Sequence, residues 1–136
     1  MTRRYRMDPS DPRLAPFWAT RRLGTLTTLR PDGSPHTVPV APVVDLTSGS
    51  PVVRVLTSAR SRKARNVSAA GGAARVSICE VEGRHWVTVE GRARVVTDPS
   101  AVAAAEQAYA VRFRPPRANP ERVVIVVEVD RVMGTL

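Results

Sequence analysis

Cysteine, aromatic residues and lysine are scarce in this sequence, and the first two scarcities exclude whole classes of protein. Cysteine occurs once, at Cys79, so no internal disulfide can form, and the two histidines are not spaced with it as ligands of a zinc site. Aromatic residues make up 4% of the chain and do not alternate with basic residues, as a stacking platform for single-stranded nucleic acid requires. We therefore expect neither a disulfide framework nor a bound metal.

Long apolar runs are also missing. The longest candidate, residues 123–127, has the length of a buried strand and falls far short of a membrane span. Residues 1–13 are basic and polar, without the apolar stretch of a secretion signal, and we expect them to be disordered. The sequence predicts a cytoplasmic protein with no membrane partner.

The chain carries a formal net charge of +9, which is typical of proteins with anionic partners. Arginine is spread over the whole sequence rather than gathered on one helix or arm, so we predict no specific nucleic-acid partner. A basic barrel that binds nucleic acid stays open as an alternative function.

With 136 residues the chain has room for one core, so we expect a single domain over residues 1–136. Hydrophobic and β-branched patterning predicts six strands at short spacings, with a helix between the third and fourth and another before the last. This order favours a mainly β (α+β) fold, a small closed or partly closed barrel with short flanking helices. The predicted strands are 23–29, 35–44, 51–57, 74–81, 85–97 and 122–132, and the predicted helices are 11–22, 64–70 and 99–113.

Turn-forming residues refine this order. Pro31, Asp32 and Gly33 predict a tight turn between the first two strands. Pro39 and Pro42 lack the backbone donor that a central strand needs, so the second strand lies at an edge or at a break in the sheet. Gly91, inside a long strand, predicts a bulge or a close approach of another backbone.

Lys63 is the only lysine beside twenty arginines (21 basic residues less one), and it lies in the densest basic run of the chain. Four cations and three hydroxyls cluster in residues 57–66, where a predicted strand leads into a predicted helix. Free backbone amides and the positive end of the helix dipole make such a place an anion site. A solvated basic surface is the alternative interpretation of the run.

Several motifs occur in an order that resembles the split β-barrel flavin and deazaflavin oxidoreductases, the superfamily of the pyridoxamine phosphate oxidases. The resemblance covers roughly residues 17–134 and is greatest to the actinobacterial branch that uses the deazaflavin coenzyme F420, in particular its biliverdin reductases. No single motif is specific; their order and spacing carry the resemblance. The motifs are Leu26-Thr27-Thr28-Leu29 with Asp32-Gly33-Ser34-Pro35-His36, Ser61-x-Lys63-x-x-Asn66, Trp86-x-x-x-Glu90-Gly91-Arg92-Ala93, and Tyr109 with Phe113-Arg114 and Pro116-Arg117-x-Asn119-Pro120.

The resemblance implies a six-stranded split barrel and a homodimer with two cofactor sites at its interface. It implies that a hydride passes from reduced F420 to a small conjugated acceptor, with biliverdin as the leading candidate. It assigns Lys63 and Ser61 to the cofactor phosphate, and Asn66 to the helix that holds it. Trp86 and residues 114–119 would reach the site from the dimer partner. The implied cofactor-binding residues are His36, Thr37, Val38, Pro39, Val40, Thr57, Ser58, Ala59, Ser61, Lys63, Ala64, Asn66 and Trp86, and the implied substrate-binding residues are Arg114, Arg117 and Asn119.

Other functions stay open on the sequence. An FMN-dependent oxidoreductase would need the same phosphate site, and a non-catalytic protein that binds a flavin or a tetrapyrrole would need only the pocket. No nucleophile with a histidine and an acid, and no pair of carboxylates, stands out as catalytic, which suits chemistry supplied by a cofactor. His36 is either a proton donor or a structural residue at a strand start. Arg60 and Arg62 either hold the oligoglutamate tail of F420 or reflect the arginine bias.

Overall fold

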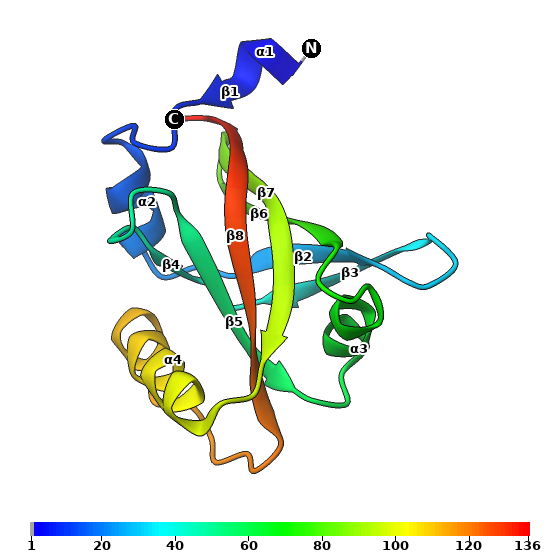
Figure 1. The fold of residues 1–136 in the computed structure, drawn as a ribbon. Helices are drawn as coiled ribbons and strands as arrows, with labels where there is room; N and C mark the ends of the chain where they lie inside the picture. Colours follow the sequence, from blue (N-terminus) through cyan, green and yellow to red (C-terminus); the bar gives the residue numbers. More distant parts are fainter. Residues whose placement is uncertain (1) are drawn as a thin grey trace.

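One antiparallel sheet organises the chain, and the computed structural model describes it over residues 2–136 (Figure 1). Its strands follow the order β3-β2-β6-β7-β8-β5-β4, and β1 adds to β8. β3 and β4, the two ends of this order, are not paired with each other, so the predicted split barrel is confirmed. The strands are β1 (Arg6–Met7), β2 (Gly24–Leu29), β3 (Pro35–Val40), β4 (Val43–Asp45), β5 (Val52–Ser58), β6 (Ala74–Glu82), β7 (His85–Val96) and β8 (Arg122–Thr135).

The sheet has eight strands, so the predicted number of six is wrong. The segment predicted as one strand over residues 35–44 is divided at Pro42 into β3 and β4, which occupy opposite edges of the sheet. Proline has no backbone donor to continue a ladder, which explains both the break and the edge positions. The second addition is β1, whose Arg6 and Met7 pair with Met133 and Val132 of β8.

Strand β1 also corrects the disorder expected for residues 1–13. Within the described part of that segment, Thr2–Tyr5 forms the short helix α1 and Arg6–Met7 forms β1. The Met7 side chain is 8% exposed and belongs to the main core. One buried apolar residue in a polar and basic segment gives no hydrophobic periodicity, so the sequence pattern does not predict this strand.

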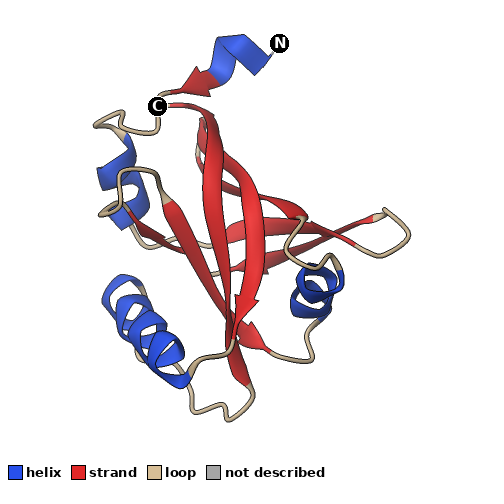
Figure 2. Ribbon diagram, in the orientation of Figure 1, coloured by secondary structure: helices blue, strands red, loops and turns tan. Residues whose placement is uncertain are grey.

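Three further helices flank the sheet (Figure 2). They are α2 (Leu14–Ala19), α3 (Arg62–Ala69) and α4 (Pro99–Arg112). Helix α2 is shorter than the predicted 11–22, but Leu14, Phe17 and Trp18 are buried on one side of it as expected. Asp98 caps α4, since its carboxylate accepts a hydrogen bond from the amide of Ala101, and Pro99 occupies the first turn. No helix in residues 2–136 is long and apolar enough to cross a membrane.

The valine run of β8 is buried on both faces. Ile125 and Val127 belong to the barrel core, whereas Val124 and Val126 pack with Ala105 of helix α4. An alternating pattern is absent here because neither face of the strand meets water.

Gly91 has both properties predicted for it. The pairing of β7 with β8 shifts by one residue between Glu90 and Gly91, which is a bulge. A side-chain carbon at Gly91 would lie 2.1 Å from the carbonyl oxygen of Glu128, so the backbones approach too closely for any other residue.

Candidate functional site

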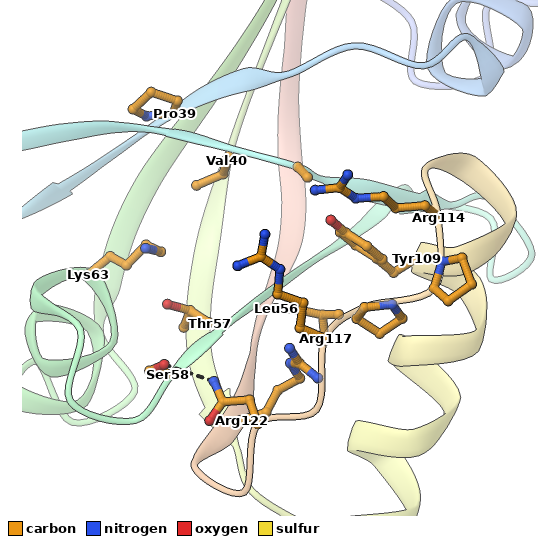
Figure 3. A pocket seen from close by; sticks show the side chains of 14 residues that line it. Pro39, Val40, Leu56, Thr57, Ser58, Lys63, Tyr109, Arg114, Arg117 and Arg122 are labelled. Carbon is orange, nitrogen blue, oxygen red and sulfur yellow. Dashed lines mark hydrogen bonds between the residues drawn. The ribbon is translucent and has the colours of Figure 1, made fainter.

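A pocket of about 410 Å³ opens where β5 ends, between helix α3 and the loop that follows helix α4 (Figure 3). The residues just before the break at Pro42 form one wall, and the loop over residues 114–119 forms the opposite one. The lining is rich in cations. It consists of Pro39, Val40, Ala41, Leu56, Thr57, Ser58, Lys63, Tyr109, Arg114, Pro115, Pro116, Arg117, Asn119 and Arg122.

Hydroxyl groups organise the junction between β5 and α3. Ser61 caps the helix, because its Oγ accepts a hydrogen bond from the amide of Ala64 at 3.2 Å. Thr57 Oγ1 donates to the same Oγ at 2.9 Å, which connects the end of strand β5 to the helix cap. The chain therefore enters α3 in one fixed direction, with the first turn of the helix beside the pocket.

The first turn of α3 presents donors that are not used within the described chain. Hydrogen bonds to Ser61 satisfy the amides of Ala64 and Arg65, while those of Arg62 and Lys63 have no partner among residues 2–136. The Lys63 ammonium is half-buried, makes no ion pair within the same residues, and points toward the pocket in Figure 3. Burial lowers the pKa of Lys63. Free amides and an ammonium without a counterion, at a helix N-terminus, form a site for an anion.

His36 lies beside this basic turn rather than in the pocket lining. Burial lowers the pKa of His36, and the positive charges of Arg30, Lys63 and Arg62 lower it further. Its Nδ1 atom is buried and has no hydrogen-bond partner among the described residues. The neutral imidazole therefore belongs to the same positive field as Lys63.

Asn66 fixes helix α3 to the barrel. The residue is 3% exposed, and its Nδ2 donates to Thr28 Oγ1 of strand β2 at 3.0 Å. Asn66 is absent from the lining, so a contact to a ligand in the pocket would be indirect.

The loop over residues 114–119 brings two guanidinium groups to the pocket. Arg114 and Arg117 are exposed and form no ion pair with any residue of the described chain. Asn119 anchors the end of the loop, since its Nδ2 donates to Ser58 Oγ at 2.9 Å and its Oδ1 accepts from the amide of Glu121. Both the nitrogen and the oxygen of its side-chain amide are thus hydrogen-bonded, which makes Asn119 an anchor of the loop.

The loop over residues 114–119 lines the same pocket as Lys63 of its own chain. Its approach to the cofactor site of a dimer partner, which the resemblance implies, stays a prediction. Trp86 lies elsewhere, at the start of β7, where its ring packs against Tyr5 with centroids 5.7 Å apart.

The structure gathers part of the predicted set. Of the implied cofactor-binding residues, Pro39, Val40, Thr57, Ser58 and Lys63 line the pocket, with Ser61 capping the adjacent helix. His36, Thr37, Val38, Ala59, Ala64, Asn66 and Trp86 are not in its lining. Arg60 turns away, because its Nε donates to Glu121 at 2.7 Å.

Sequence reasoning missed Tyr109, Leu56 and Arg122 as lining residues. Tyr109 of α4 and Phe113, the residue that caps this helix, stand four residues apart with ring centroids at 5.1 Å, and this spacing could have indicated a shared face toward the site. Arg122 is held by Glu106, with Nη1 and Oε2 2.7 Å apart. Nothing in the local sequence distinguishes it from the other arginines.

Comparison with known proteins identifies the family of the chain. The family model for pyridoxamine 5'-phosphate oxidase matches residues 10–135. The chain is 45% identical over 126 residues to an F420H(2)-dependent biliverdin reductase of Mycobacterium tuberculosis (strain CDC 1551 / Oshkosh), covering 93% of this chain and 88% of that protein.

Solved structures give the same fold. A conserved hypothetical protein from Mycobacterium tuberculosis superimposes with a TM-score of 0.78 at 26% identity, covering 98% of this chain and 88% of the other. A structure described as an F420 reductase has a TM-score of 0.64 at 25% identity, covering 85% and 91%. The chain therefore belongs to the pyridoxamine 5'-phosphate oxidase family.

Proposed function

We propose that this protein is an F420-dependent oxidoreductase that reduces a conjugated small molecule, with biliverdin as the leading acceptor. The observation that carries the proposal is the basic pocket lined by Lys63, Arg114 and Arg117, none of which forms an ion pair among residues 2–136, beside a helix whose first two amides have no partner among the same residues. The relative at 45% identity, named an F420H(2)-dependent biliverdin reductase, supports both the cofactor and the acceptor.

The residues beside α3 fit the anionic part of such a cofactor. Lys63 and the amides of Arg62 and Lys63 would hold its phosphate, and Ser61 would keep the helix in place for that contact. Thr57, Ser58 and Ala59 would follow the chain that leads from the phosphate to the ring. When bound, the reduced deazaflavin supplies a hydride.

The wall formed by β3 would accompany the ring of the cofactor. Pro39 and Val40 line the pocket, and His36, Thr37 and Val38 precede them on the same strand. Backbone groups of an edge strand are available to a ligand because no second strand pairs with them on that side. The protein's own work is to hold the ring, exclude water and orient the acceptor.

The arginines of residues 114–119 would bind the acceptor. A tetrapyrrole with two propionates needs cations at the rim of an apolar surface, and Arg114 and Arg117 offer planar donor pairs for carboxylates. Pro115 and Pro116 restrict the backbone between them, which keeps the loop stiff. Asn119 would act on the acceptor through the loop it anchors.

We further propose a homodimer. Several large apolar side chains are exposed, among them Leu23 at 62%, Val81 at 60% and Val111 at 89%, and the sheet has two open edges. In a dimer, Trp86 would complete the cofactor site of the partner. Sedimentation equilibrium tests this directly, and a stable monomer at micromolar concentration would refute it.

A cofactor comparison tests the proposed function. Purified protein is titrated with F420 and with FMN, and reduced F420 is then mixed with biliverdin while the bands of the deazaflavin, biliverdin and bilirubin are followed. We expect tighter binding of F420 and formation of bilirubin. Preferred binding of FMN would support a flavin oxidoreductase instead, and tight binding without turnover of any acceptor would support a binding protein.

Variants of the loop refine the test. Arg117→Ala should raise KM for biliverdin more than it lowers kcat, since the contact forms in both ground state and transition state. Arg92→Ala is the control, because Arg92 is also exposed but lies on strand β7 outside the pocket lining. Equal effects of the two substitutions would remove Arg117 from the acceptor site.

A further inference from the structure

A buried cluster of charges lies behind the pocket walls. Arg112, the last residue of α4, and Glu80 of β6 have side chains that are 4% and 3% exposed, with Nη2 and Oε1 2.6 Å apart. Arg22 Nη1 lies 3.7 Å from the same oxygen, and its side chain is 10% exposed. None of these groups lines the pocket, and the proposed reaction uses none of them.

The Arg112 guanidinium joins four separate segments of the chain. Its Nε and Nη2 atoms donate to the carbonyl of Thr20 at 3.3 and 2.9 Å, and its Nη1 atom donates to the carbonyl of Pro42. With the bond to Glu80, one side chain connects the end of α4 to the segment after α2, to the break between β3 and β4, and to β6. A planar guanidinium donates from three separate nitrogens in fixed directions, whereas an ammonium donates from one point.

Two of these four segments continue directly into opposite walls of the pocket. Pro42 follows Val40 and Ala41, which form one wall, and Arg112 stands two residues before Arg114, which begins the other. The far end of that loop is fixed by the hydrogen bond from Asn119 to Ser58. Arg112 is thus the anchor at the near end of the loop, and it holds that end against the Pro42 wall.

Stability alone is a poor account of this cluster. Charges removed from water lose hydration, and replacing a buried ion pair by apolar residues is often neutral for the free energy of unfolding. Burial raises the pKa of Glu80, against the opposing effects of Arg112 and Arg22, so burying that carboxylate has a cost that the two arginines do not fully offset. The hydrogen bonds of Arg112 fix how the connected segments are oriented relative to one another, which apolar packing would not do.

We propose that Arg112 is a positioning residue: with Glu80 it sets the distance between the Pro39–Pro42 wall and the loop over residues 113–119, so that Arg114 and Arg117 meet the carboxylates of the acceptor. This inference rests on the proposed function for the identity of the acceptor. It names the residue pair that determines the shape of the acceptor side of the pocket.

The test replaces the pair together, so that neither partner is left buried alone, and Arg22 keeps its ion pair with Glu82. In Arg112→Met/Glu80→Met we expect KM for biliverdin to rise about tenfold and kcat to change less than about threefold, with F420 affinity within about twofold of wild type. Hydrogen exchange should accelerate in peptides covering residues 113–119 and 39–43, and should stay unchanged in α3. Arg112→Lys should resemble the double variant, because lysine keeps the positive charge but lacks the planar set of guanidinium donors.

The control separates positioning from stability. Val87→Ala removes volume from a side chain that is 1% exposed in β7, and should lower the melting temperature without changing KM or the exchange of residues 113–119. Unchanged KM and exchange in the double variant would overturn the proposal, as would faster exchange spread evenly over the sheet. If wild-type protein does not reduce biliverdin, the proposed function fails, and the exchange pattern still decides whether Arg112 positions the walls.

Discussion

Replacing Lys63 by methionine removes the only ammonium side chain of the chain and keeps a flexible side chain of similar length against the pocket wall. The anion site beside α3 then retains the amides of Arg62 and Lys63 but loses its half-buried charge. We expect this variant to fold normally and to bind the phosphate-bearing cofactor weakly.

The structure sets the size of both effects. A hydrogen bond to a charged group contributes roughly 1.5–3 kcal/mol, so the dissociation constant for F420 should rise about 10-fold to 100-fold. In the protein without ligand, the same ammonium has no counterion among the described residues and its pKa is lowered by burial. Its removal should therefore leave the free energy of unfolding unchanged or raise it.

The assay compares F420 binding, followed by its fluorescence, with urea unfolding of the same samples. Arg92→Met is the matched control, since it also converts a cation to methionine but at an exposed position of β7 outside the pocket lining. Two results would refute the reasoning: wild-type affinity in Lys63→Met, or loss of affinity together with loss of stability. The second would mean that the ammonium supports the fold and not the ligand.

Three further predictions use other features of the chain. Gly91→Ala should lower the free energy of unfolding by about 1–3 kcal/mol or more, because the new carbon would lie 2.1 Å from the Glu128 carbonyl oxygen. Urea denaturation measures this change, and an unchanged midpoint would contradict the close approach. Because the pKa of His36 lies below 6.5, the unfolded chain takes up the proton more readily than the folded one, so the free energy of unfolding should fall as the pH drops below about 6.5. When stability is measured between about pH 5 and about pH 8, His36→Gln should flatten this part of the profile. An identical profile in the variant would exclude His36 as its source. F420 with its oligoglutamate tail should bind more weakly as salt rises, and Arg62→Gln/Arg65→Gln should reduce that dependence; a tail-independent response to salt would remove both arginines from tail binding.

Much of the fold was predictable from its turn-forming and strand-breaking residues. Gly33 adopts a φ of 85° in the predicted turn, and the carboxylate of Asp32 accepts hydrogen bonds from the amide and hydroxyl of Ser34. Pro42 marked a break, but only the structure shows that the two halves go to opposite edges of the sheet. Strand β1 was not predictable, since two residues carry no periodicity and its place depends on pairing with β8.

The site was predictable on one side only. Residues 57–63 are local in sequence, so a strand end, a helix cap and a lysine could be read together. The opposite wall depends on tertiary contacts that join distant residues, such as Asn119 with Ser58 and Arg112 with Pro42. For this reason the sequence alone did not bring the two walls together, and the approach of residues 114–119 to a partner's site stays a prediction.

The central position of β8 also has a consequence for how the chain acquires its structure during synthesis. β8 pairs with β7, β5 and β1, and it is the last strand of the sheet to leave the ribosome. Until it emerges, the pair β4–β5 has no partner in common with the group β3-β2-β6-β7, and the facing edges of β5 and β7 are open to other chains. The barrel can therefore close only after translation has passed residue 135, and the interval before that is when a nascent chain of this protein is most exposed to aggregation.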